Sequence, residues 1–197
     1  MTFEDEELLR RVRDGDPRAG RQLFDRCQAS VNRRVLRMLG RDDDHNEIVQ
    51  NVFVEAFRGI LAGAQPRHLD SWVLGITNHV VVNELRRRQQ WWCKKREPEL
   101  PDVVDGRASP CENLATEAVI ARVYRALKQL PTREYIAYTL KIIEDEPLAE
   151  IMKTLKCSMT TAKRTIRQAK DRLRRIVERD PVLREYLRIE EVTHGST

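Results

Sequence analysis

Aromatic residues, paired cysteines and long apolar runs are scarce in this sequence of 197 residues. Aromatics make up 6% of the chain and charged residues 34%. That balance favours bundles of helices with Leu, Ile, Val and Ala cores over a sheet-rich fold. We therefore expect an all-α protein, and the length predicts two small helical domains with a connector.

Several kinds of chemistry have no counterpart in the sequence. The four cysteines (Cys27, Cys93, Cys111 and Cys157) form no CxxC pair, and no histidine stands at finger-like spacing, so we expect no metal site. A Walker loop, a dinucleotide fingerprint and a nucleophile elbow are missing too, so we expect neither a catalytic residue nor a cofactor. The acidic start MTFEDEELL and the lack of an apolar run of about 18 residues predict a cytoplasmic protein with free thiols and no membrane insertion.

Charge is segregated along the chain. The net charge of +5 by itself fits either a nucleic-acid binder or a soluble basic protein. Its distribution indicates more, because 86–96 holds six Lys or Arg and no acid, and 156–178 holds eight against two acids. The stretch 42–55 is acidic, and 97–117 holds six acids and one Arg. This separation indicates two partners of opposite charge.

Apolar spacing predicts helices in the first half. Between Glu6 and about Leu39 the apolar residues recur every three or four positions, with an interruption at 15–17, so we expect two helices joined by a turn. Gly40 ends the second, and Asp42 to Asp44 supply an N-cap and favourable charge for a third helix at about 44–60. Its expected buried stripe is Ile48, Val49, Val52, Phe53, Ala56 and Phe57.

A loop at 61–70 precedes a long helix that starts near Asp70 or Ser71 and runs into the basic block. The early half of this helix is apolar. Trp72 lies in that half, either as a core anchor or as a platform for a base, whereas Trp91 and Trp92 either stack on single strands or cover the joint to the linker. The expected organisation is an N-terminal domain at 1–96, a Pro-containing acidic linker at 97–113, a C-terminal domain at 114–178 and a tail at 179–197 that forms a short helix.

The C-terminal domain carries a helix-turn-helix pattern. We expect one helix at about 115–130 and a second that runs to about Ile143, with Thr132 as its N-cap. A turn then leads to a short helix at 148–155. Ser158 caps a final helix at 159–178. Ala162, Ile166, Ala169, Leu173 and Ile176 share its inner face, and Lys163, Arg164, Arg167 and Lys170 face outward. Such a helix start can enter a major groove, although charge alone also fits an ordinary solvated helix.

These segments together resemble the extracytoplasmic-function sigma factors. Residues 126–177, with the opening Leu130 and Pro131, resemble the family's minus-thirty-five-reading domain. Residues 6–60 resemble its polymerase-binding domain, and 69–88 its minus-ten-reading helix. The resemblance implies an alternative sigma factor that binds core RNA polymerase, directs initiation at particular promoters and is held inactive by an anti-sigma protein, commonly in a stress response.

The resemblance also implies roles for residues. Residues expected to read the minus-thirty-five element are Ser158, Thr160, Thr161, Lys163, Arg164, Arg167, Gln168 and Lys170. Those expected at the minus-ten element are Arg67, His68, His79, Asn83, Arg86, Arg87 and Arg88. Those expected on the clamp helices of the polymerase's largest subunit are Asp44, Glu47, Gln50, Asn51 and Glu55. Val52 and Phe53 lie in the same segment but serve equally well as core residues.

Three departures from the family pattern bear on promoter choice. His79 stands where the family often has Asn, and Lys156 where it often has Gly. Lys156 takes a left-handed turn at some cost, or the turn is shaped differently. The linker is unusually acidic, and we hypothesise that Glu97, Glu99, Asp102 and Asp105 mimic phosphate inside the polymerase; unchanged abortive transcripts after their neutralisation count against this.

Two other kinds of protein compete with this interpretation. A polymerase-independent regulator that binds operators as a dimer explains 147–177 but not the acidic helix or the basic segment 69–96. A degenerate sigma factor that only sequesters a regulator conflicts with the basic recognition residues. Cys157 is either a redox sensor or, as we favour, a buried structural thiol. The role of the tail at 179–197 stays open.

Overall fold

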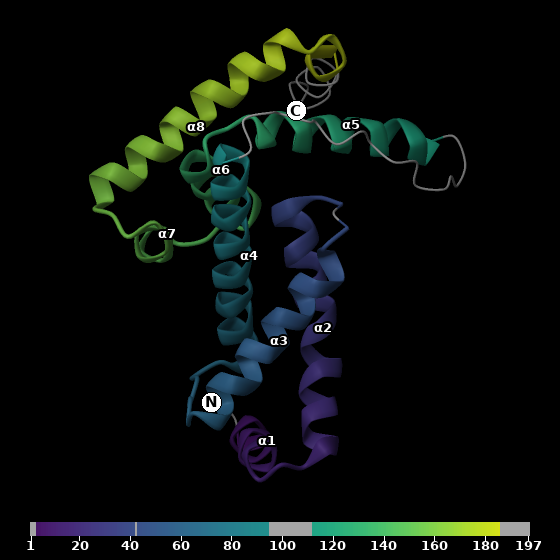
Figure 1. Ribbon diagram of the computed structural model, residues 1–197, viewed down its shortest axis with the longest axis vertical. Helices are drawn as coiled ribbons and strands as arrows, with labels where there is room; N and C mark the ends of the chain where they lie inside the picture. Colours follow the sequence, from purple (N-terminus) through teal and green to yellow (C-terminus); the bar gives the residue numbers. More distant parts are fainter. Residues whose placement is uncertain (1–2, 42, 95–111, 186–197) are drawn as a thin grey trace, which may run out of the picture. The chain divides into compact units, whose positions relative to one another are not determined.

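Helices account for the ordered elements of the chain (Figure 1). The computed structural model describes residues 3–41, 43–94 and 112–185, with side chains left out at 89–94 and 112–116. No strand occurs within these ranges, which confirms the all-α expectation. Some of the residues discussed above lie outside the described residues or side chains. They are those of the proposed linker and the end of the tail, together with Trp91, Trp92, Cys93 and Cys111.

The chain divides into two compact units, Met1–Leu85 and Arg86–Thr197. The first contains α1 (Phe3–Arg13), α2 (Pro17–Leu39), α3 (His45–Leu61) and the first part of α4 (Leu69–Lys94). The second contains α5 (Glu112–Lys128), α6 (Thr132–Tyr138), the π-helix η1 (Thr139–Ile143), α7 (Leu148–Leu155) and α8 (Met159–Arg179). The division falls inside α4, so the domain boundaries expected from the sequence stay predictions. None of the described helices is long and apolar enough to cross a membrane.

The turn expected at 15–17 and the stop expected at Gly40 are confirmed. Asp16 caps α2 by accepting the Arg18 N–H at 2.8 Å, and Pro17 opens the helix. Gly15 has a φ of 80°, which a glycine adopts without strain. Gly40, with a φ of 77°, ends α2 and donates its N–H to the Leu36 carbonyl. These local signals are sufficient to predict where α2 begins and ends, because each acts on backbone groups within one helical turn.

Three details of the first unit differ from the expectation. Asp44 occupies the N-cap position of α3, but its side chain makes no capping hydrogen bond there. Phe57 is half-buried, whereas Ile60 is buried and completes the inner stripe, because it follows buried Ala56 by four residues on the same face of α3. The following helix, α4, starts at Leu69, one residue earlier than expected, and Leu69 is itself buried.

The second unit is built around α6, which packs along α8. Thr132 is not the N-cap, because Pro131 occupies that position in an extended conformation and Thr132 is already helical. The single helix expected up to Ile143 changes into the π-helix η1, where the Glu144 N–H reaches back five residues to the Thr139 carbonyl. This wider turn ends the segment, and the chain reverses at Asp145, whose φ is 48°.

The beginning of the tail belongs to the second unit. Asp180 accepts the Val182 and Leu183 N–H groups at 3.0 and 3.2 Å, and Arg122 of α5 pairs with the same carboxylate at 3.1 Å. Leu183 is only 3% exposed. The expected short helix is present at 181–185, and it fastens the end of α8 to α5.

Candidate nucleic-acid interface

The two helices of the helix-turn-helix, α7 and α8, are joined by a tight turn at Lys156 and Cys157. Lys156 is left-handed, with φ 49° and ψ 57°, which decides between the two shapes that the sequence left open. Its N–H donates to the Lys153 carbonyl, and the Cys157 N–H donates to the Met152 carbonyl, as in a helix end that usually carries glycine. The turn therefore has the left-handed shape that glycine favours, with a lysine at that position.

The start of α8 is capped as expected. The Ser158 hydroxyl accepts the Thr161 N–H at 3.3 Å. On the inner face Ala162, Ala169 and Leu173 are buried, while Ile166 and Ile176 are half-buried. Thr165 is also buried, although its residue type did not mark it as a core position, because its hydroxyl is satisfied by the Thr161 carbonyl at 2.9 Å.

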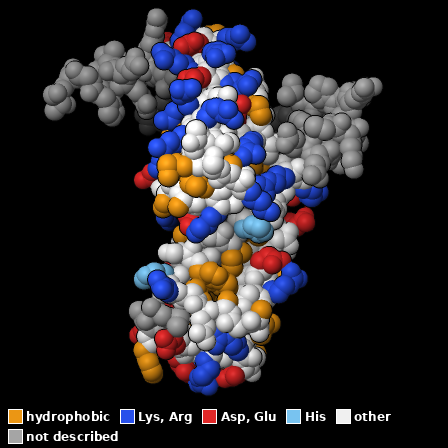
Figure 2. All heavy atoms as spheres, turned by 90° about the vertical axis from the view of Figure 1, so that its left-hand side faces the viewer, with side chains coloured by type: hydrophobic (Ala, Val, Ile, Leu, Met, Phe, Trp, Pro, Cys, Tyr) orange, Lys and Arg blue, Asp and Glu red, His pale blue; other side chains and the backbone are white. Residues whose placement is uncertain are grey.

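The outer face of α8 carries cations that nothing in the described chain neutralises. The exposed side chains are those of Lys163, Arg164, Arg167, Gln168 and Lys170. No carboxylate described in the structure lies within salt-bridge distance of these four cations. Further along the same helix, by contrast, Arg172 pairs with Glu134 at 2.9 Å and Arg174 with Glu178 at 3.1 Å. Figure 2 shows Lys and Arg side chains gathered over the part of the surface that α8 forms.

This arrangement is suited to an anionic partner. Ser158 and Thr160 are exposed beside these cations, and Thr161 is half-buried. Arg and Lys donate to guanine edges and phosphates, and hydroxyls donate to phosphate oxygens. Exposed cations without a described partner also occur near the end of α8, at Arg175 and Arg179, but only those that follow its capped start lie beside the Ser158 and Thr160 hydroxyls. The start of α8 is therefore the candidate surface for DNA.

The loop between α3 and α4 is held in place by α1. Arg13 donates to the carbonyls of Ile60, at 3.2 Å, and Ala64, at 2.9 Å. Trp72 is half-buried and lies against α3: a Cβ added at Gly59 would come within 2.9 Å of its ring. Trp72 is thus a packing residue, the first of the two roles that the sequence left open. Sequence reasoning missed Arg13, since nothing in its local pattern points to a loop 47 residues away.

Arg67 and His68, the residues expected to capture a flipped base, are exposed on this loop. Farther along α4, His79 and Asn83 are also exposed, and the His79 Nε2 and Asn83 Nδ2 atoms lie 2.9 Å apart. These residues therefore present polar groups on one helix and its preceding loop.

The three arginines expected to hold phosphates differ in exposure. Arg87 is exposed, whereas Arg86 and Arg88 are half-buried. Asn78, which the sequence did not single out, is 8% exposed and accepts a hydrogen bond from Arg34 of α2 at 3.1 Å. It joins α4 to α2 and does not face a ligand.

A second polar surface covers the outer side of α3. Asp44, Glu47, Gln50, Asn51 and Glu55 are all exposed. Val52 and Phe53 are 0% and 4% exposed, and the Phe53 ring lies 4.6 Å from that of Phe24, so both belong to the core. Among the exposed groups, Glu55 is paired with Arg58 of the same helix. The outer side of α3 is therefore polar and acidic, and its inner side is apolar.

One arginine ties the beginning of α4 to α1 and α2. Arg26 donates to Asp5 at 2.7 Å and to both Asp70 oxygens, at 2.7 and 3.1 Å. These hydrogen bonds raise the pKa of Arg26. Beside it, burial and the negative charge of Asp70 raise the pKa of the Cys27 thiol to about 11. Sequence reasoning did not identify this cluster, because its members are up to 65 positions apart.

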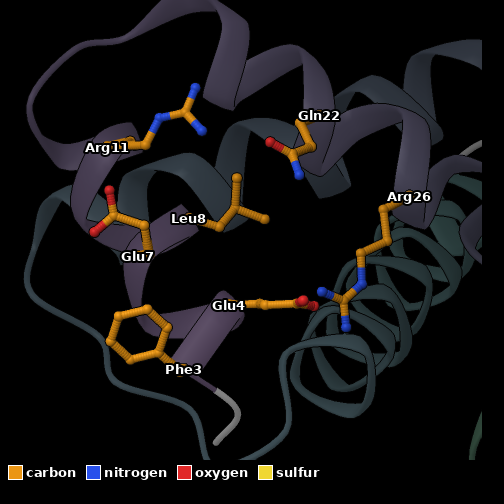
Figure 3. A pocket seen from close by; sticks show the side chains of 7 residues that line it. All are labelled: Phe3, Glu4, Glu7, Leu8, Arg11, Gln22 and Arg26. Carbon is orange, nitrogen blue, oxygen red and sulfur yellow. The ribbon is translucent and has the colours of Figure 1, made fainter.

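A pocket of about 390 Å³ opens beside Arg26, between α1 and α2 (Figure 3). Leu8 lies in it and Phe3 stands at its edge. Three of its four charged residues already have partners, since Glu7 pairs with Arg10, Arg11 with Asp16, and Arg26 with Asp5 and Asp70, whereas Glu4 has none among the described residues. The pocket is a feature of the framework and offers little unsatisfied charge to a ligand.

Comparison with known proteins identifies both halves of the chain. Residues 23–91 match the model of Sigma-70 region 2, and residues 120–173 match that of Sigma-70 region 4. The chain is 23% identical to the RNA polymerase sigma-H factor of Pseudomonas aeruginosa, over 92% of this chain and 97% of that one. It is 21% identical to the ECF RNA polymerase sigma factor SigW of Bacillus subtilis, over 85% of this chain and 93% of that one.

Solved structures share the fold. CnrH, in complex with the cytosolic domain of CnrY, superposes with a TM-score of 0.58 at 20% identity and covers 89% of this chain and 98% of its own. The sigma factor RpoE of Bartonella quintana, in complex with the anti-sigma factor NepR, superposes with a TM-score of 0.55 at 15% identity, over 81% and 97%.

The described part of the chain is all-helical, carries a capped, basic helix-turn-helix and matches both sigma regions in order. The protein is therefore a sigma-type transcription initiation factor. Within that class, this chain belongs to the extracytoplasmic-function family of sigma factors.

Proposed function

We propose that this protein is an alternative sigma factor that binds core RNA polymerase and directs initiation at a particular set of promoters. The observation that carries the proposal is the outer face of α8, where Lys163, Arg164, Arg167 and Lys170 are exposed and without a carboxylate partner among the described residues. Binding to DNA phosphates and base edges requires exposed cations, and these four are grouped on one face directly after the capped start of α8.

Roles of individual residues follow from the same surfaces. The start of α8 reads the minus-thirty-five element, with Ser158, Thr160, Thr161 and Gln168 beside the cations. The loop and α4 engage the minus-ten element through Arg67, His68, His79, Asn83 and Arg86 to Arg88. Because extruding a base costs a few kcal/mol, the Arg13 contacts that fix the loop contribute by ordering it before DNA arrives.

The outer face of α3 docks on the clamp helices of the largest polymerase subunit. Glu47, Gln50 and Asn51 are exposed and are not needed by the core, which Val52 and Phe53 fill. Carboxylates and amides on such a face suit a basic partner surface. Nucleotide addition belongs to polymerase, so this chain needs no catalytic residue, and it acts in the cytoplasm, where polymerase and promoters are.

An anti-sigma protein controls this activity in our proposal. Support comes from two structures that share the fold of this chain. RpoE was solved with the anti-sigma factor NepR, and CnrH was solved with the cytosolic domain of CnrY. An anti-sigma protein that covers the outer face of α3 blocks binding to polymerase, and one that covers the outer face of α8 blocks binding to the promoter; initiation requires both interactions.

Run-off transcription from a library of random promoters tests the proposal. Core polymerase is assayed alone, with this protein, and with the Arg167→Ala and Glu47→Lys variants. We expect new transcripts when the unsubstituted protein is added, from templates that share two spaced upstream motifs, and fewer of them with either variant. If polymerase neither binds the protein nor starts new transcripts, while the protein alone shifts particular duplexes, a polymerase-independent regulator replaces the sigma factor.

A further inference from the structure

Lys156 stands in a backbone conformation that lysine disfavours. Among the described residues, only Lys156 and Asp145 combine a side chain with a positive φ. In the left-handed conformation a Cβ crowds the neighbouring carbonyl, which glycine avoids. The two hydrogen bonds at this helix end, from the N–H groups of Lys156 and Cys157, involve the backbone alone and do not require a lysine.

The Lys156 side chain gains nothing visible within the protein in return. It is exposed, and the described chain offers its ammonium neither a hydrogen bond nor an ion pair. Nearby lysines behave differently, because Lys153 pairs with Glu150 at 2.7 Å and Lys141 with Asp145 at 3.0 Å. Strained residues persist where a function requires them.

A structural explanation competes with a functional one. A cation at a helix C-terminus interacts favourably with the helix dipole, and Lys156 ends α7. Lys153 already places a cation in the last turn of this helix, however. An interaction with a molecule outside the chain accounts better for an unpaired lysine at this position.

We propose that Lys156 binds a backbone phosphate at the edge of the major groove that α8 enters. The proposal rests on the proposed function. Lys156 lies two residues before Ser158, where α8 begins, and the exposed cations of α8 start at Lys163. A recognition helix contacts bases through its first turns, so the turn that precedes it lies beside the phosphates that border the groove. The lysine adds affinity without reading sequence.

Three variants of the full-length protein test this role. Lys156→Gly removes both the charge and the strain, and Lys156→Asn removes the charge while keeping a residue that tolerates the left-handed region. Lys128→Ala removes one exposed lysine elsewhere in the same unit and serves as the matched control. Binding to a random-sequence DNA duplex is measured by fluorescence anisotropy over a series of KCl concentrations, for the chain alone and with core polymerase. Thermal unfolding is followed in parallel.

We expect Lys156→Gly to be more stable and to bind DNA less well. Relief of strain raises the unfolding midpoint by roughly 4 °C. Loss of one phosphate contact makes the plot of log affinity against log salt shallower by about 0.9, for Lys156→Gly and Lys156→Asn alike. Lys128→Ala keeps the slope of the unsubstituted protein.

The outcomes separate this role from the proposed function. If Lys156→Gly and Lys156→Asn keep the original slope while the unsubstituted protein starts promoter-specific transcripts, the phosphate contact is wrong and the sigma-factor function stands. An equal change of slope in Lys128→Ala also overturns the contact, because any lysine then has the same effect. If the unsubstituted protein binds no duplex DNA by itself and starts no promoter-specific transcripts with core polymerase, both proposals fail.

Discussion

The outer faces of α3 and α8 have the same construction and opposite charge. Each is the exposed side of a helix whose other side is buried, with Val52 and Phe53 inward on α3 and Ala162 and Ala169 inward on α8. Outward, α3 presents carboxylates and amides, and α8 presents cations that have no partner among the described residues. In the function proposed above, the sign of the exposed charge decides which partner each helix binds, a basic protein surface or DNA.

The two helices are held by different means. The first unit uses arginines that reach across the bundle, Arg26 to Asp5 and Asp70 and Arg13 to loop carbonyls. In the second unit α8 depends on its own cap, on burial against α6 and on the Arg172 pair with Glu134. A perturbation placed in one unit should therefore affect one interaction and spare the other.

The largest effect is expected from Ile151→Ala, which damages only the second unit. Ile151 of α7 is 0% exposed, and removing its buried methyl groups costs about 2–5 kcal/mol in the free energy of unfolding. Urea unfolding measures this loss, with Ile120→Ala, at a position 49% exposed, as the control. We expect promoter-duplex binding to fall while binding to core polymerase is kept. Loss of both together would contradict the separation of the two surfaces.

Arg167→Ala should weaken promoter binding by about 1–3 kcal/mol if the guanidinium contacts a base edge. Arg164→Ala should act in the same way. Arg174→Ala is the matched control, because Arg174 is paired with Glu178 at 3.1 Å on the same helix. Affinity of the reconstituted polymerase for a selected promoter is the measurement. Full promoter-specific transcription by the Arg167 and Arg164 variants would rule out their assignment to base contacts.

Glu47→Lys reverses a charge on the outer face of α3. Against a basic partner surface we expect about a tenfold loss of affinity for core polymerase, or about 1.4 kcal/mol, that is smaller at high salt. Glu6→Lys, on an exposed position of α1, controls for net charge. Titration of labelled protein with core polymerase provides the affinities. Equal losses for both variants would point to total charge and away from a docking face.

The smallest effect concerns Cys27, where the Arg26 cluster meets the core. Its pKa, raised from 9.0 to about 11 by burial, means that the folded state keeps the proton which the unfolded state releases. The resulting stabilisation is complete below about pH 9 and is lost as the pH rises through about 11. We expect iodoacetamide to modify half-buried Cys157 before Cys27 at pH 8, as read by peptide mass spectrometry. Fast modification of Cys27 in the folded protein would show that its environment is open.

Most helices could be predicted because their signals are local. Pro17 and Ser158 open helices, Gly40 closes one, and each acts on backbone groups within a turn. The π-helix η1 could not be predicted, since its apolar spacing is compatible with an ordinary helix. The exposed cations of α8 follow from a periodicity of 3.6 residues, but the pairing of Arg172 with Glu134 depends on how α6 crosses α8.

The sequence alone determined the class of fold, the order of the helices, the charge of their outer faces and the family resemblance. These properties depend on residue type and short-range spacing. The tertiary structure decided which charged side chains of the described residues find partners in other helices, as Arg172 does with Glu134, and that Arg26 joins residues from three helices. Those outcomes depend on distances between segments far apart in the chain, which the packing of the helices sets and no local pattern encodes.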